Sequence, residues 1–276
     1  MNYSIDDFHN FRKYSNLQRI GNQIKSNYVY KYLDIDGAKA SLENSTLRFK
    51  APNEWDDPYE SRFYGAKYDL VEKEKFDKRL YACCVTKNPL SEAAWRMYTK
   101  DPQKHCVKFT ICIGKLREYL NDFALKEKAR LFEGAVKYQL NDKEINGLHL
   151  KDSPYFNIFF DNFREKEYLN LMLIKRQLFH YEGEIRYMLM GNFDFSSPLD
   201  IEIPWAMCLK KISFNERETS DEDEEIIRKA LKTNYSFCKK KYSLTYEPYI
   251  PIEPENIYKS FSQITVGKTT KNEINL

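Results

Sequence analysis

The sequence predicts a single α+β domain with a central mixed or antiparallel β-sheet covered by helices. Short runs of alternating or continuous apolar residues recur along the chain, and such runs are typical of strands. They lie at 28–33, 46–50, 81–86, 106–113, 134–140 and 183–190. Longer segments with helical spacing separate them, and neither an internal repeat nor a low-complexity linker divides the 276 residues. We therefore expect one domain over 1–276, with a motif-bearing core at about 28–190 and a C-terminal helix and tail at 206–276.

Composition limits the class of protein. Hydrophobic residues make up 42% and aromatic residues 15% of the chain, which is enough for a large core. The net charge of +3 is not that of a strongly basic nucleic-acid binder, although it permits a local basic groove. The first residues are polar and acidic, and no run approaches the ~18 apolar residues of a membrane span. The six cysteines show no CxxC spacing, so we expect reduced thiols, a cytoplasmic location and no membrane contact.

The first half of the chain is expected to alternate helices with strands. Asp36 is the predicted N-cap of a short helix, because a carboxylate there can accept a bond from a free backbone N–H. The expected elements are a loose helix at 5–24, a strand at 28–33, a helix at 36–44, a strand at 46–50, an exposed helix at 66–80, a strand at 81–86, a short helix after Ser91, a strand at 106–113 and a helix at 115–132.

The second half continues the pattern. The expected elements are a strand at 134–140, a polar insert at 141–153, a long buried helix at 156–178, the strand at 183–190, a loop at 191–204, a strand at 206–214, a helix after 219 and an extended tail from 246. Thr219 and Glu222 have capping-box spacing. Acids at the start of that helix and lysines at its end complement the helix dipole, so its charges are assigned to stability.

Charged residues alternate along one predicted strand. Glu182, Glu184 and Arg186 would share one face, and Ile185 and its neighbours Tyr187 and Leu189 would face the core. Strand charges mostly face water, so an ordinary solvated face is the simpler interpretation. The alternative is a site for a hydroxyl-rich or phosphate-bearing ligand. His180 is a weaker candidate for proton transfer.

The segment 51–60 is predicted to be a loop held in turns. It contains two prolines with Asn53, Asp56 and Asp57, residues that favour turns for reasons of local hydrogen bonding and restricted φ. Trp55 would fix the loop by packing. Asp56, Asp57 and Glu60 either shape the turns or bind a cation or substrate hydroxyls.

Several common catalytic motifs are absent. The sequence contains no GxxxxGK[ST], GxGxxG, GxSxG or HExxH motif. Its four histidines fall in four different predicted elements, which argues against a histidine-rich metal centre.

Five motifs occur in an order that resembles a bacterial domain family of unknown function, marked by YKY, NDPfE, WxxY and ExExR. They are Tyr30-Lys31-Tyr32, Pro52-x-x-Trp55-x-Asp57-Pro58-x-Glu60, Cys84-x-Thr86, Trp95-x-x-Tyr98 and Lys175-x-x-x-Phe179-x-x-Glu182-x-Glu184-x-Arg186. The chain departs from the family pattern in having Asp56 in place of Asn and Phe179 in place of Trp, and it lacks a Gly-Pro pair near 212–215.

The same motifs resemble, more distantly, the ADP-ribosyltransferase fold. That resemblance implies Glu184 as the catalytic carboxylate, Glu182 as the first acid of an E-x-E pair, and Thr86 near the nicotinamide ribose. A fixed carboxylate suits this chemistry because cleavage of the glycosidic bond develops oxocarbenium character. The NAD-binding residues implied are Tyr30, Lys31, Tyr32, Trp55 and Arg186, with Lys31 or Arg186 on the pyrophosphate.

Three functions remain open from the sequence. One is an NAD-consuming transferase or glycohydrolase that acts on a macromolecule, as a toxin or phage-defence factor. A second is a metal-dependent hydrolase or nuclease that holds Mg²⁺ or Mn²⁺ with the acids of 56–60 and 182–184. A third is a non-catalytic nucleotide or nucleic-acid binding module, with Lys31, Arg48 and Arg186 on phosphates and tyrosines on bases. We favour the first, with NAD as substrate and no bound metal.

Overall fold

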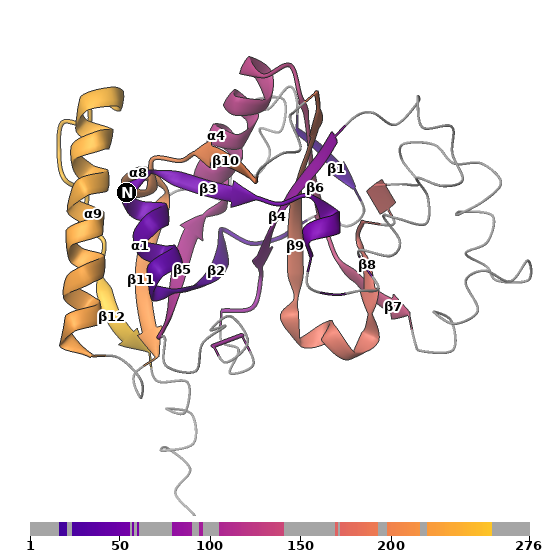
Figure 1. Cartoon of the computed structure of the whole chain (residues 1–276), viewed down its shortest axis with the longest axis horizontal. Coiled ribbons are helices and arrows are strands. Elements are labelled where there is room, and N and C mark those ends of the chain that lie inside the picture. The colour runs from indigo at the N-terminus through magenta and orange to yellow at the C-terminus, as the bar shows by residue number, and fades with distance from the viewer. Residues whose placement is uncertain are drawn as a thin grey trace, which may run out of the picture.

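An eight-stranded sheet runs through the protein (Figure 1). The computed structural model describes residues 17–20, 24–55, 57, 60, 79–89, 94–95, 105–140, 169–170, 172–192, 198–215 and 220–255. The strand order is β1-β6-β9-β4-β2-β5-β11-β12. These strands are β1 (Leu17–Ile20), β2 (Tyr28–Asp34), β4 (Arg79–Thr86), β5 (Cys106–Cys112), β6 (Arg130–Ala135), β9 (Glu184–Gly191), β11 (Leu209–Asn215) and β12 (Ile252–Glu255). Inner pairs are antiparallel and the two edge pairs, β1–β6 and β11–β12, are parallel. The predicted α+β class with a mixed central sheet is confirmed.

Two small sheets and several helices complete the described fold. The antiparallel pair is β3 (Thr46–Phe49) with β10 (Leu199–Glu202), and the parallel pair is β7 (Lys137–Leu140) with β8 (Ile174–Arg176). The α-helices are α1 (Ile35–Glu43), α4 (Ile113–Lys126), α8 (Trp205–Cys208) and α9 (Asp221–Tyr242). Two 3-10 helices, η3 (Pro52–Glu54) and η5 (Gln177–Glu182), lie in the loops before β4 and β9. No helix in the described part of the chain is long and apolar enough to cross a membrane.

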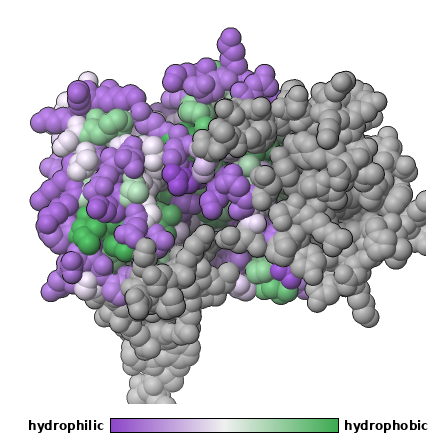
Figure 2. Space-filling view, viewed as in Figure 1, coloured by the Kyte–Doolittle hydropathy of each residue, from purple (hydrophilic) through white to green (hydrophobic). Residues whose placement is uncertain are grey.

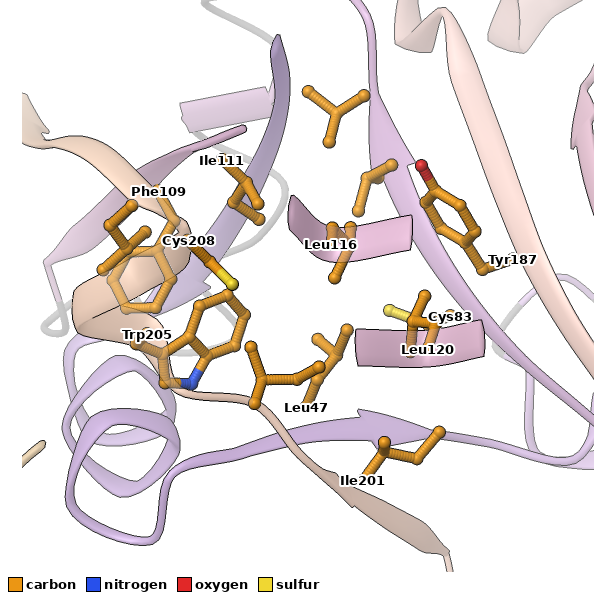
Figure 3. Close-up of a cluster of buried hydrophobic side chains, with 14 of the residues drawn as sticks. Leu47, Cys83, Phe109, Ile111, Leu116, Leu120, Tyr187, Ile201, Trp205 and Cys208 are labelled. Carbon is orange, nitrogen blue, oxygen red and sulfur yellow. The ribbon is translucent and has the colours of Figure 1, made fainter. Parts of the chain in front are cut away.

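One face of the large sheet forms the main core. Odd-numbered residues of β9 and β5, such as Ile185, Tyr187 and Phe109, are fully buried there, as alternation predicts. Leu116 and Leu120 of α4 pack into the same cluster (Figure 3). The other members drawn include Leu47 of β3, Ile201 of β10, and Trp205 and Cys208 of α8. The small β3–β10 sheet therefore covers part of the core. The opposite face of the large sheet, called the polar face below, carries Glu184 and Arg186 beside buried apolar residues such as Met188 and Phe132.

Helix α9 is fixed by its cap and by one buried amide. Ser220 and Asp223 form a reciprocal capping box. Asn234 donates to the carbonyl of Leu42 (3.1 Å) and to Ser45 Oγ (2.8 Å), and its side-chain oxygen accepts from the Ala206 N–H (2.8 Å). The helix therefore binds the α1–β3 turn and α8 at one point, and Figure 1 shows it beside α1.

One face of the described part of the molecule is mostly polar. On the face seen in Figure 2 the described residues are largely hydrophilic, with small separate hydrophobic patches.

All six cysteines are unpaired thiols, as their spacing predicts.

Some predicted elements were wrong in type. Residues 130–132 belong to strand β6 and not to the preceding helix, because Leu131 and Phe132 pair with Leu189 and Met188 of β9. Residues 206–208 are helical, and the strand that follows them begins only at Leu209. The end of the predicted helix 156–178 is instead β8 and the start of η5, and residues 17–20 are a strand within the predicted helix 5–24. Where these residues form β1, β6 and β8, pairing with a strand distant in sequence overrides local propensity.

Other elements differ in position. The strand 46–50 pairs with β10 and touches the large sheet only through a bridge from Lys50 to Ala82. The predicted loop 191–204 contains β10, and the predicted strand 134–140 is divided between β6 and β7. Asp34, not Asp36, caps α1. The predicted elements at 66–78 and 141–153, and most of the helix at 156–168, lie outside the described residues.

Candidate functional site

Three chemically distinct side chains form a row across adjacent strands on the polar face of the large sheet. Tyr30 of β2 pairs with Thr86 of β4, and Thr86 pairs with Glu184 of β9. Directly paired residues on antiparallel strands point to the same face. The sheet therefore places Tyr30, Thr86 and Glu184 side by side, although Tyr30 and Glu184 are more than 150 residues apart in sequence.

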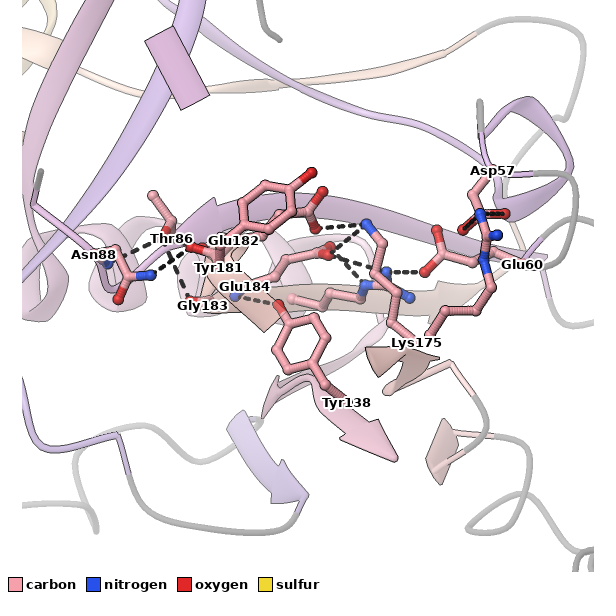
Figure 4. A network of polar contacts seen from close by, with 12 residues as sticks. Asp57, Glu60, Thr86, Asn88, Tyr138, Lys175, Tyr181, Glu182, Gly183 and Glu184 are labelled. Atoms are coloured by element: carbon pink, nitrogen blue, oxygen red, sulfur yellow. Dashed lines mark hydrogen bonds and ion pairs between the residues drawn. The ribbon is translucent and has the colours of Figure 1, made fainter. Parts of the chain in front are cut away.

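Glu182 and Glu184 both contact Lys175, although they belong to different elements. Glu184 begins β9, but Glu182 ends η5 and is not on the strand, contrary to the prediction from alternation. Gly183 between them has φ of 53°, a left-handed conformation that glycine adopts without steric cost. This turn lets both carboxylates approach Lys175 of β8, whose Nζ lies 2.6 Å from Glu182 Oε2 and 3.3 Å from Glu184 Oε2 (Figure 4).

Arg186 is buried and fully engaged. Its Nε donates to Glu184 Oε1 (2.7 Å), Nη2 pairs with Glu60, and Nη1 donates to the Met172 carbonyl. Its guanidinium lies 4.3 Å from the ring centroid of Trp55. Only 5% of Glu184 and 1% of Arg186 is exposed. The interpretation of this strand face as solvated is therefore wrong.

A second ion pair continues the network away from the strand. Arg176 of β8 lies 3.3 Å from Asp57, and the ring of Phe179 lies 4.8 Å from the cationic groups of both Lys175 and Arg176. Figure 4 shows the carboxylates of 57–60 meeting the cations of 175–186 at one end of the network. Two of the sequence motifs, 52–60 and 175–186, are thus brought together by charge pairing.

The turn before β9 is held by three hydrogen-bonding side chains. Thr86 Oγ1 donates to the Glu182 carbonyl and accepts from the Asn88 N–H (2.9 Å), and Asn88 Nδ2 donates to the Tyr181 carbonyl (2.7 Å). Tyr138 of β7 accepts a bond from the Glu184 N–H (2.8 Å). Tyr138 and Asn88 were missed by sequence analysis, because neither lies in a motif or in a recognisable pattern.

The environments of the carboxylates move their pKa values apart. Burial alone would raise the pKa of Glu184, but Arg186 and Lys175 beside it lower that pKa to about 2. Burial raises the pKa of Glu182 and of Glu60, and the neighbouring cations offset this only in part. One firmly ionised carboxylate thus lies beside another with a higher proton affinity, an arrangement suited to electrostatic stabilisation and proton transfer.

The predicted nucleotide-binding residues fall in two places. Tyr30 and Tyr32 lie on the face that carries Glu184, and Tyr32 is buried edge-on against Trp95 at 5.1 Å between centroids. Lys31 points to the opposite face, where its ammonium donates to the Cys84 carbonyl (3.1 Å). Trp55 and Arg186 belong to the ion network described above. Lys31 is therefore left out of the candidate site.

The described residues give little support to the two alternative predictions, a metal site and a phosphate-binding surface. In the described part of the chain, no group of three or more carboxylate, imidazole or thiol side chains is arranged to hold a metal ion. Asp56 lies outside the described residues. Arg48 is exposed on β3 and pairs with Asp200 (2.8 and 2.7 Å), whereas Arg186 is buried in the ion network. His180 is exposed and lies edge-on to Tyr138 (5.4 Å between centroids).

Comparisons with known proteins found one distant likeness. No family model and no curated protein sequence matches the chain. Among solved structures, DarT from Thermus sp. 2.9 in complex with carba-NAD+ matches with a TM-score of 0.33 and 11% identity, over 84% of this chain and 97% of that one. The same protein in complex with NAD+ matches with a TM-score of 0.29 and 10% identity over the same shares. A likeness this distant does not assign an activity, which must rest on the residues of the site.

Proposed function

We propose that this protein transfers the ADP-ribosyl group of NAD to a macromolecule. The observation that carries the proposal is the row of Tyr30, Thr86 and Glu184, with Glu184 held ionised at the start of β9. It is the arrangement that the sequence resemblance implies for such an enzyme. NAD would be a substrate, and the buried carboxylate with its adjacent aromatic side chains suits a ribose and a flat base.

Glu184 is assigned the role of stabilising positive charge on the ribose. In this reaction the bond between the ribose anomeric carbon and the nicotinamide nitrogen breaks, and nicotinamide leaves with the electron pair. A fixed carboxylate stabilises the oxocarbenium character and accepts a bond from a ribose hydroxyl. The contact from Lys175 to Glu184 (3.3 Å) is longer than its contact to Glu182 (2.6 Å), so it is the one a hydroxyl would replace.

Glu182 is assigned the role of proton acceptor. The new bond forms between the anomeric carbon and a nucleophilic group of the target, and that group must lose a proton. The raised pKa of Glu182 favours uptake of that proton. Glu182 ends helix η5, most of whose residues are exposed, so we assign the approach of the target to this side. A role as a toxin or defence factor stays a prediction.

Nicotinamide release and label transfer from NAD test the proposal. Wild-type protein is incubated with labelled NAD in three separate reactions. One contains mixed protein, one DNA and one RNA as the target. Glu184→Gln should lower both rates by about a hundredfold or more, because removal of one preorganised electrostatic group typically costs that much. The matched control is Glu133→Gln, another buried glutamate paired with an arginine, Arg117 (2.6 Å), but on the core face of the sheet.

The two variants separate catalysis from stability. Both lose one buried charge from an arginine pair, so a loss of folding would affect them alike. If Glu184 is catalytic, the folded Glu184→Gln protein should lose activity and the folded Glu133→Gln protein should keep it. No turnover by wild type with any of the three target classes, or full turnover by Glu184→Gln, would contradict the proposal and favour a non-catalytic module.

A further inference from the structure

A buried lysine lies on the polar face of the sheet at a distance from the carboxylates. Lys108 of β5 pairs with Tyr32 of β2, and β2 and β4 separate it from β9. Three strand spacings of ~4.8 Å place it roughly 14 Å from the Glu184 strand. Only 2% of Lys108 is exposed, so its charge needs partners within the protein.

Aromatic rings and one carbonyl surround the ammonium group. Nζ of Lys108 lies 5.4 Å from the ring centroid of Tyr30 and 5.7 Å from that of Trp95. It also donates to the carbonyl of Pro89 (2.7 Å). This combination suits a phosphate joined to a base, because the cation takes the charge of the phosphate and Tyr30, which is only partly buried, can contact the base. Trp95 is buried and packs against the ammonium group.

The carboxylate that neutralises Lys108 comes from the last described strand. Glu255 at the end of β12 forms an ion pair with Lys108, and its side chain is 19% exposed against 2% for the lysine. Glu255 is therefore the member of the pair that solvent reaches more easily. Burial and, after it, the charge of Glu255 raise the pKa of Tyr30.

Strand β12 is suited to detach. It has four residues, lies at the edge of the sheet, and contains Pro254, which has no N–H to give to the ladder. Short edge strands of this kind belong to the least stable parts of a fold. Leaving the buried ammonium unpaired would be costly, so another anion must replace Glu255 when the strand moves.

We propose that Lys108, Tyr30 and Trp95 form a subsite for the phosphate group of a nucleotide, and that Glu255 occupies this subsite as an internal competitor. Binding of the phosphate exchanges one anion for another on Lys108 and releases the end of β12. The subsite stands on the contacts of Lys108 and does not depend on the proposed transfer reaction.

Calorimetric titration with ADP and with inorganic pyrophosphate tests the subsite. Glu255→Gln keeps the shape of the side chain and removes the competing charge, so ADP should bind about tenfold more tightly, an effect within the range typical of coupled sites. Lys108→Met should lose ADP binding. ADP should bind more tightly than pyrophosphate, since only ADP offers a base to Tyr30. Equal affinity for the two would overturn the assignment to a nucleotide.

A neighbouring ion pair on the same strand provides the control. Glu253 of β12 pairs with Lys211 of β11 (2.9 Å), and both side chains are more exposed, at 53% and 31%. Glu253→Gln makes the same change in net charge, and it should alter ADP affinity far less than Glu255→Gln. Equal effects would show a general charge effect and overturn the proposal.

Hydrogen exchange gives a second measurement that does not require Lys108→Met to fold. ADP should increase amide exchange in β12 of the wild-type chain, because Glu255 leaves its partner. Unchanged or slower exchange there with ADP bound would overturn the release of the strand. A chain that shows this release but no turnover of NAD would keep the subsite and refute only the proposed reaction.

Discussion

Glu184 and its two cationic partners determine how the site responds to acid. The folded-state pKa of Glu184 is lowered to about 2, because Arg186 and Lys175 outweigh the effect of burial. Stability from a lowered carboxyl pKa is present above the unfolded-state value, near 4.5, and is lost as pH falls toward 2. The shift corresponds to a free energy on the order of 3 kcal/mol.

Glu184→Gln should therefore weaken the acid dependence of stability. Urea unfolding between pH 3 and pH 7 should show a wild-type free energy that falls below about pH 4.5 more steeply than that of Glu184→Gln. Glu60 and Glu182 act in the opposite direction, because their raised pKa values make protonation favourable in the folded state. Parallel pH profiles for the two proteins would contradict the assignment of the ionised charge to Glu184.

At the residue scale the sequence indicated several residues of the candidate site but not their environment. The sequence indicated Glu182, Glu184 and Arg186 because two acids and a base alternate in a short stretch. The turn at Gly183 takes Glu182 off the strand, but both acids still contact Lys175. Their burial was not predictable, because it depends on the loop 52–60, which supplies Trp55 and Glu60 from far away in sequence. Lys31 was grouped with Tyr30 and Tyr32 because the three form one motif, although neighbouring residues of a strand point to opposite faces.

At the element scale, the turn from η5 into β9 controls the geometry of both acids. Gly183 has a left-handed φ, and a Cβ at this position would lie 2.6 Å from Asn88 Nδ2. Gly183→Ala should therefore destabilise the protein by about 1–2 kcal/mol through backbone strain, with a further cost from displacing Asn88. It should also lower NAD turnover, since Asn88 holds the Tyr181 carbonyl beside Glu182.

Two comparisons isolate the cause of that effect. Gly114→Ala in α4 adds the same methyl group where no atom lies within 4 Å, and it should be neutral or stabilising by up to about 1 kcal/mol. Asn88→Ala combined with Gly183→Ala should remove the clash and leave the backbone strain. Thermal unfolding measures all three, and a Gly183→Ala protein as stable as wild type would refute the strained turn.

Element prediction succeeded where a strand could be recognised from its own residues. The strands β2, β4, β5 and β9 lie close to their predicted ranges, because each has a continuous or alternating apolar pattern. The short strands β1, β8, β10 and β12 have three or four residues and were not predicted. They form because a neighbouring strand offers free backbone groups, which is a property of the whole sheet and not of their own sequence.

At the scale of the whole molecule, the C-terminal segment is part of the same sheet as the predicted core. Strand β11 pairs with β5, and α9 packs on α1, so no boundary separates the described parts of 28–190 and 206–255. We expect the chain to unfold as one cooperative unit, in agreement with the predicted single domain. Asn234 is a suitable position to test this, because one buried amide joins α9 to α1, the α1–β3 turn and α8.

Asn234→Ala should destabilise the whole sheet and not only helix α9. The substitution leaves the Ala206 N–H, the Leu42 carbonyl and the Ser45 hydroxyl without their buried partner, at a cost of about 2–4 kcal/mol. Ser236→Ala, on the exposed side of the same helix, should change stability by less than about 0.5 kcal/mol. Hydrogen exchange with mass spectrometry in low urea would follow peptides from α9 and from β9 separately. Equal loss of protection in both peptides supports one cooperative unit, whereas loss confined to α9 would show that the C-terminal part unfolds by itself and that the single-domain prediction is wrong.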